Sequence, residues 1–217
     1  MISVFAAFYP IVQLMNLGFP IIGGPGIISL ALILGPINGL ILGPLSGCIA
    51  TAIGASIGMA TGIGTSFSPL VVLNRSLGAV EAGILSKRYV DVQGREKRIP
   101  GWLTGVLLLA VVSCLWYFFP VGRSAPFYPS LHLSGVLVAL LLNGNISIFL
   151  EGSNRFKVAL GVAVASYCAL LADHILGTVI FISVMGWHTS RYSTLFMQIL
   201  PISLLERITL TVLATII

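Results

Sequence analysis

The sequence predicts an all-α fold: a polytopic integral membrane helix bundle of about six to eight spans, with about eight as the best count. Three observations predict this class. Hydrophobic residues make up 57% of the 217 residues and charged residues only 8%, whereas a soluble domain carries about 25% charged residues. The mean hydropathy is +1.07. The apolar runs have the length of membrane helices, which argues against a β-barrel.

The candidate spans follow one another in a single transmembrane domain, residues 1–217. The first is short, and a loop rich in glycine and proline follows it at residues 18–26. The second is also short, so it either crosses the bilayer or dips into it and returns. Gly43 and Pro44 predict a tight turn, because proline suits the first position of a helix. In order, the predicted spans are 2–17, 27–42, 44–62, 70–86, 101–119, 131–150, 158–185 and 199–217.

Residues 27–64 carry no charge, and glycine recurs in them at intervals of four. Residues four apart lie on one face of a helix, and small residues let membrane helices approach closely. We therefore predict that Gly47, Gly54 and Gly58 pack against another helix, either in this chain or on a partner.

The most polar stretch, residues 87–100, indicates the orientation of the chain. It holds five basic and two acidic residues, and short basic loops stay in the cytoplasm. We therefore expect a multi-pass protein of the cell (plasma or inner) membrane with this loop in the cytoplasm. Both termini are cytoplasmic if residues 27–42 cross the bilayer. Most of the net charge of +5 lies in this loop, so it indicates topology and no nucleic-acid partner.

Several kinds of chemistry lack their usual sequence motifs. The chain contains neither the glycine-lysine loop that holds ATP phosphates nor a His-Glu-x-x-His zinc motif. Its three cysteines fall inside apolar runs, where buried thiols are the ordinary interpretation. Its three histidines do not cluster in the sequence, and His132 and His188 fall near predicted outer ends. We expect no cofactor, no metal and no catalytic residue, and therefore no enzyme.

Two predicted spans carry ionisable residues at membrane depth, where such a group usually faces protein or water. Asp173 lies on a face of small residues, and Arg207 shares a face with Ser203 and Thr211. Glu206 is about 100° around the helix from Arg207, so the two need not pair. Either Asp173 and Arg207 pair with each other, or with other residues, to lock the bundle, or they line a polar cavity for a substrate.

The cavity interpretation predicts a small, anionic ligand. Arg207 would hold its acidic group, because a guanidinium presents a planar fork of donors. Ser203 and Thr211 would add hydrogen bonds, and Asp173 would accept one from elsewhere on the ligand. Asn143 is a further candidate for this substrate site, although membrane amides more often bond across helices.

Three other polar residues carry weaker expectations. Arg75 is expected near the outer interface and Glu81 near the inner one. Asp173 and His174 are adjacent, but neighbours in sequence do not face each other on a helix. Their adjacency therefore does not by itself predict a catalytic dyad.

The order of motifs resembles that of a transporter family. A short first helix and a Pro/Gly-rich loop precede Gly35-Pro36-x-x-Gly39 and a glycine-rich helix. A polar turn with Ser-Pro, a helix containing the sequence LGAVEAG and the basic loop follow. This order resembles the substrate-binding S-component of energy-coupling factor (ECF) transporters, the vitamin uptake systems of prokaryotes. The resemblance is best over residues 1–120 and weaker over the last helix, which opens Leu200-Pro201-Ile202. Members usually have about six spans, so residues 131–185 read as additional or rearranged helices.

The resemblance implies a substrate-capturing subunit of an importer for a vitamin or similar small molecule. Separate ATPase subunits would energise it through a transmembrane coupling subunit. Ala6 and Ala7 are adjacent here, so the Ala-x-x-x-Ala with which many members contact that subunit does not transfer. Two alternatives stay open: a proton- or sodium-coupled secondary transporter in which Asp173 or Glu206 titrates, and an intramembrane enzyme that acts on lipid through Asp173 and His174.

Overall fold

The computed structural model describes residues 1–15, 17–20, 27–63, 68–91, 98–185 and 189–217, and their regular structure is mostly helical. The helices are α1 Ile2–Leu14, η1 Leu30–Ile33, α2 Leu34–Leu42, α3 Pro44–Ala60, α4 Val71–Leu85, α5 Gly101–Leu115, η2 Trp116–Phe118, α6 Pro120–Ser124, α7 Ser130–Leu142, α8 Asn145–Glu151, α9 Arg155–Met185 and α10 Thr189–Ile216. Two antiparallel pairs of short strands complete the fold, β1 Gly18–Pro20 with β2 Ile27–Ser29 and β3 Tyr89–Asp91 with β4 Arg98–Pro100.

Three helical segments are long and apolar enough to cross a membrane: Gly101–Phe118, α9 and Arg191–Ile216. Together α7 and α8 also meet this description, but they are bent by 72° at their junction, so the described residues contain up to four such spans. The segments α1, Leu30–Leu42 and α3 are apolar but shorter. The helical class is confirmed, and the predicted count of about six to eight spans is not.

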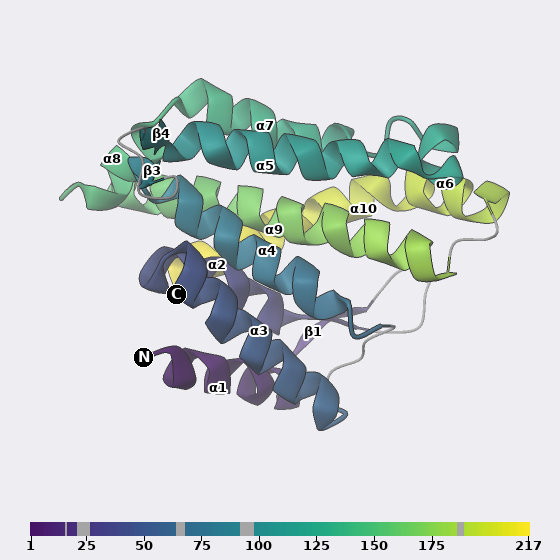
Figure 1. The fold of residues 1–217 in the computed structure, drawn as a ribbon, viewed down its shortest axis with the longest axis horizontal. Coiled ribbons are helices and arrows are strands. Elements are labelled where there is room, and N and C mark those ends of the chain that lie inside the picture. Colours follow the sequence, from purple (N-terminus) through teal and green to yellow (C-terminus); the bar gives the residue numbers. More distant parts are fainter. Residues whose placement is uncertain (16, 21–26, 64–67, 92–97, 186–188) are drawn as a thin grey trace.

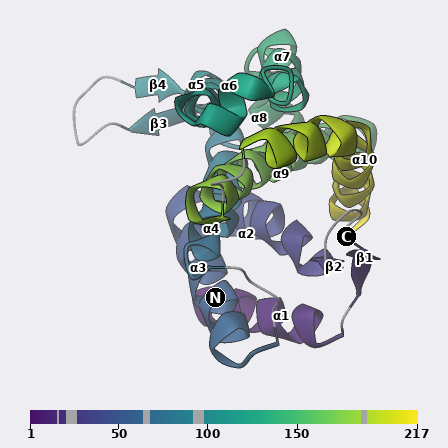
Figure 2. The ribbon, with the colours of Figure 1, turned by 90° about the vertical axis from the view of Figure 1, so that its right-hand side faces the viewer.

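The helices form three layers (Figure 1). One layer contains α5 and α7, the middle layer contains α9 and α10, and the third contains α1 to α4. The third and middle layers meet where α4, which also packs on α2 and α3, lies against α9. In the end-on view, α1 to α4, α9 and α10 pack as one group, and α5 to α7 cover one side of it (Figure 2). The core lies along α9, where Leu170, Leu171 and Ile175 are fully buried.

Glycines hold the third layer together at close range. A side chain at Gly39 of α2 would collide with the backbone carbonyl of Ala79 in α4. A Cβ at Gly83 of α4 would lie 2.5 Å from the backbone nitrogen of Pro44. The predicted turn at Gly43 and Pro44 is confirmed, since Gly43 adopts φ 84° and Pro44 begins α3.

Two predicted element boundaries are wrong. The run 131–150 is not one straight helix, because Asn143 and Gly144 both adopt the left-handed conformation and separate α7 from α8. The predicted outer loop 186–198 is helical from Thr189 onward, and α10 continues through Pro201. That proline deprives α10 of one backbone hydrogen bond, and the helix continues without it.

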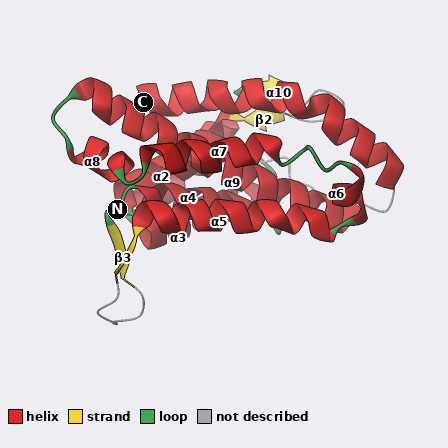
Figure 3. Cartoon of the chain, turned by 90° about the horizontal axis from the view of Figure 1, so that it is seen from above, coloured by secondary structure: helices red, strands yellow, loops and turns green. Residues whose placement is uncertain are grey.

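Both chain termini, α8 and the β3–β4 pair lie towards one end of the molecule (Figures 1 and 3). At that end Arg88 forms an ion pair with Glu151, with 2.7 Å between Nη2 and Oε2. The opposite end contains α6 and the start of α10. The described ends of the basic loop and both termini therefore lie at the same end of the molecule. The middle of that loop, residues 92–97, lies outside the described residues.

Candidate binding site

A buried ion pair joins α4 to α9. Arg75 Nη1 lies 3.1 Å from Asp173 Oδ2, and the Asn74 amide donates to Asp173 Oδ1. Small residues allow the two helices to approach so closely. A Cβ at Gly78 would lie 3.1 Å from the carbonyl oxygen of Ala169. The small-residue face of α9 that contains Asp173 therefore packs on α4.

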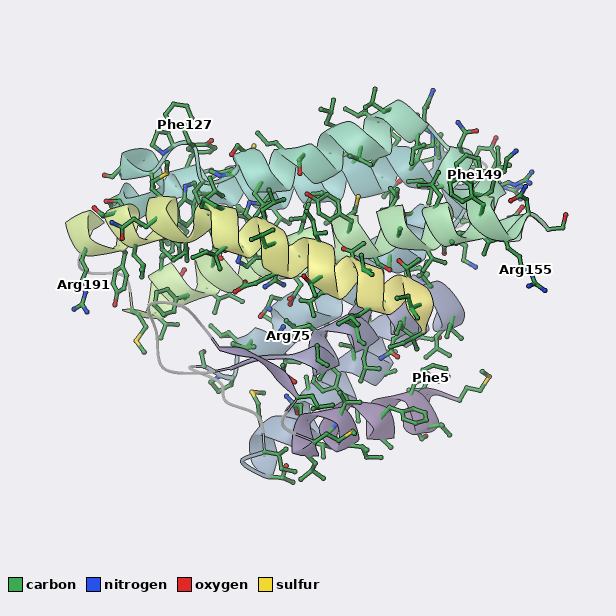
Figure 4. The ribbon with its side chains drawn as sticks, turned by 180° about the vertical axis from the view of Figure 1, so that it is seen from behind. Phe5, Arg75, Phe127, Phe149, Arg155 and Arg191 are labelled. Carbon is green, nitrogen blue, oxygen red and sulfur yellow. The ribbon has the colours of Figure 1, made fainter. Side chains whose placement is uncertain are left out.

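The partner of Asp173 is thus Arg75. Figure 4 shows it in the interior, between α10 and the helices of the third layer. Its side chain is 25% exposed and that of Asp173 is 8% exposed. Of the two structural alternatives for Asp173, the structure has the pairing with another residue, because α4 engages its carboxylate instead of Arg207.

A narrow void borders this ion pair and is too narrow to hold a water molecule. Besides the two charged residues, its walls are Tyr9, Leu32, Gly35, Pro36, Thr51 and Gly78. The ion pair is therefore closed to solvent on this side. A wider hollow opens at the surface between α6 and α10, and it is lined by Ser124, Ser193, Thr194, Met197 and Gln198.

Arg207 is the second buried charge, and its guanidinium is incompletely paired. Only 3% of the residue is exposed, and its Nε and Nη1 atoms have no hydrogen-bond partner in the described part of the chain. Its Nη2 atom lies 3.9 Å from Glu206 Oε2, which is too far for a hydrogen bond. The two neighbours thus approach each other, although their helical spacing does not require it.

The other residues predicted for the substrate site differ in their burial and in the hydrogen bonds that they could make to a ligand. Ser203 is buried on the same side of α10. The hydroxyl of Thr211 donates to the backbone carbonyl of Arg207 at 2.7 Å, so it retains only acceptor capacity. Asn143 is exposed at the junction of α7 and α8 and does not contribute to this group. Glu81 is fully buried, and its Oε2 atom has no partner among the described residues.

Two histidines that are distant in the sequence contact each other, and the charge of Arg207 acts on both. His132 Nε2 lies 3.2 Å from His174 Nδ1, so the fold brings together two histidines that are 42 positions apart in the sequence. His174 Nε2 lies 3.4 Å from the hydroxyl of Tyr128, which in turn lies 3.3 Å from Thr178 Oγ1. Burial raises the pKa of Tyr128, in the turn before α7, to about 12. His188 lies outside the described residues.

Asp173 and His174 face different partners, so they form no Asp–His hydrogen bond within the described residues. No three His, Cys, Asp or Glu side chains gather as metal ligands in that part of the chain. The side chains that do gather are two imidazole rings and two hydroxyls, those of His132, His174, Tyr128 and Thr178. The charge of Arg207 acts on both histidines and on Tyr128. This arrangement can attract an anion.

The three predicted packing glycines all lie at helix contacts within the chain. A Cβ at Gly47 would lie 2.6 Å from the carbonyl oxygen of Asn38 in α2. A Cβ at Gly54 would lie 2.5 Å from Cβ of Tyr9 in α1, and one at Gly58 would collide with the side chain of Gln13. The glycine face of α3 is therefore covered by α1 and α2.

Fold and site together define a broad class, a mostly helical bundle with membrane-length helices and buried charges. An uncharacterized protein of Methanocaldococcus jannaschii is 26% identical over 137 residues, which are 63% of this chain. The match spans about two fifths of the relative, 41% of its length. No family model matches the sequence, and no solved structure matches it. Functional inference therefore rests on the residues of this chain.

Proposed function

We propose that this protein is the substrate-capturing membrane subunit of an ECF-type importer and that it binds a small anionic molecule. The observation that carries the proposal is Arg207, a buried guanidinium with two donors that have no partner among the described residues. ATPase subunits on other chains would energise uptake, because the sequence lacks a phosphate-binding loop of its own.

An unpaired buried cation is costly. The penalty for burying one ion is on the order of several kcal/mol, and buried donors in folded proteins nearly always have partners. The neighbouring Glu206 compensates Arg207 only in part at 3.9 Å, and Asp173 is already paired with Arg75. A carboxylate or phosphate group on a ligand would supply the missing acceptors.

The packing of the helices supports the family resemblance. The group formed by α1 to α4, α9 and α10 has six helices, the number of spans usual in the S-component family. On this proposal the added helices would be α5 to α8, residues 101–151, in place of the segment 131–185 expected from the sequence. We propose that the short helices of this group also lie in the bilayer, which restores a count of about eight spans.

Small-molecule mass spectrometry of the purified protein tests this proposal. Native protein should release a small carboxylate or phosphate, and Arg207→Gln should remain folded but release far less of it. Arg191→Gln is the matched control, because Arg191 is exposed at the end of the molecule (Figure 4). An unchanged yield from Arg207→Gln would exclude Arg207 as the binding residue.

Co-purification tests the importer assignment separately. A complex with a membrane coupling subunit and ATPase chains is expected when the protein is isolated gently from its native membrane. Ion-driven uptake by the lone chain in vesicles would instead indicate a secondary transporter.

A further inference from the structure

We propose that the Arg207 site binds its anion together with one proton, which the pair formed by His132 and His174 takes up. This inference rests on the proposed function, because it requires an anion at Arg207. It goes further by coupling the substrate to a second ligand, the proton.

The histidine contact limits how many protons the pair holds. A hydrogen bond between His132 Nε2 and His174 Nδ1 needs one nitrogen to donate and the other to accept. At least one of the two rings is therefore neutral while they remain bonded. The remaining ring nitrogens differ, since His132 Nδ1 is buried without a partner in the described chain, whereas His174 Nε2 faces Tyr128.

The hydrogen-bond chain beyond His174 accommodates one extra proton. When His174 is neutral, its Nδ1 donates to His132 and its Nε2 accepts from the hydroxyl of Tyr128. When His174 is charged, its Nε2 donates to Tyr128, and Tyr128 donates to Thr178 at 3.3 Å. Thr178 donates in both states to the carbonyl oxygen of His174 at 2.8 Å. Adding the proton therefore reverses the bond between Tyr128 and His174, forms one between Tyr128 and Thr178, and breaks none.

Burial comes first and nearby charges second among the causes that oppose an extra proton on the pair. The charged and titratable groups around the pair are Arg207 and Glu206 from α10, Arg75 from α4, Asp173 from α9, and Tyr128. Asp173 is neutralised by Arg75, so the uncompensated charge is that of Arg207. Like charges disfavour each other in a buried site. An imidazolium is therefore disfavoured by its burial and by the charge of Arg207, and an anion at Arg207 would remove the second of these costs.

Linkage then fixes the sign of the pH dependence. Because the proton binds with the anion, affinity for the anion should rise as pH falls, by up to about tenfold per pH unit while one proton is taken up. A site without this coupling would have the same affinity throughout the neutral range.

The experiment uses the purified full chain in detergent, with acetate and sulfate as probes because both are fully ionised near neutral pH. Binding is measured at several pH values, and proton uptake is measured by calorimetry in two buffers of different ionisation enthalpy. Native protein should take up about one proton per bound anion. Arg207→Gln should bind neither probe, whereas His174→Gln should bind more weakly, without proton uptake and without a pH trend. Tyr128→Phe should reduce proton uptake, because it removes the acceptor of the extra proton.

The outcomes separate the two proposals. Arg207-dependent binding without proton uptake would overturn the coupling and leave the proposed function standing. The coupling would also be overturned, with the proposed function left standing, if His174→Gln still took up a full proton on binding the anion. If neither probe binds native protein better than Arg207→Gln, the anion site itself is wrong, and both proposals fail together.

Discussion

Arg75 and Asp173 stabilise the fold as a pair, since each keeps the other from being a lone buried charge. We expect Arg75→Gln or Asp173→Asn alone to lower the free energy of unfolding by about 3 kcal/mol. The double variant should lose less than the sum of the two, because contacting residues are coupled. Chemical unfolding in detergent measures all three losses. Strictly additive losses would mean that the two groups do not interact.

Single residues were easier to find in the sequence than their partners. The small face around Asp173 and the hydroxyl face around Arg207 point to buried positions, and both residues are buried. The partner of Asp173 lies 98 positions earlier, and the two histidines are 42 positions apart. Such contacts depend on how α4, α7 and α9 are rotated against one another, which periodicity in one sequence does not specify.

At the scale of elements, the contact of α3 with α1 depends on Gly54. Leucine at this position would overlap Tyr9, whose Cβ would lie 2.5 Å from the new Cβ. We expect Gly54→Leu to destabilise the protein by about 1–3 kcal/mol, measured as a loss of thermal stability. Ser56→Leu is the matched control, because Ser56 is exposed on the same helix and should tolerate the change. Equal stability of the two variants would place Gly54 outside the contact.

The helix boundaries show which signals a sequence carries. The residue types of Gly43 and Pro44 are enough to predict the turn, because Gly43 can adopt positive φ and Pro44 suits the start of a helix. The break between α7 and α8 was missed because the apolar run continues on both sides of it. Its signal was present in Asn143 and Gly144, a dipeptide typical of turns. Pro201 had the opposite effect, because it favoured a helix start nearby although α10 continues through it.

At the scale of the whole molecule, the two ends differ in charge. Described basic residues at the end with both termini are Lys87, Arg88, Arg98, Arg155 and Lys157, whereas Arg123 and Arg191 lie at the other. If the protein spans the membrane as proposed, the positive-inside rule predicts that the first end faces the cytoplasm. In a chain without its native cysteines, Arg155→Cys should resist an impermeant thiol reagent in intact cells and react after lysis. Phe127→Cys, at the opposite end (Figure 4), should react in intact cells. The reverse pattern would invert the topology.

The tight void beside Arg75 and Asp173 has a consequence for how water can reach the ion pair. Because the void is too narrow for a water molecule and α4 and α9 together hold the pair beside it, no file of water molecules can pass through this point. Water can therefore reach the pair only where its two side chains are exposed, chiefly at Arg75.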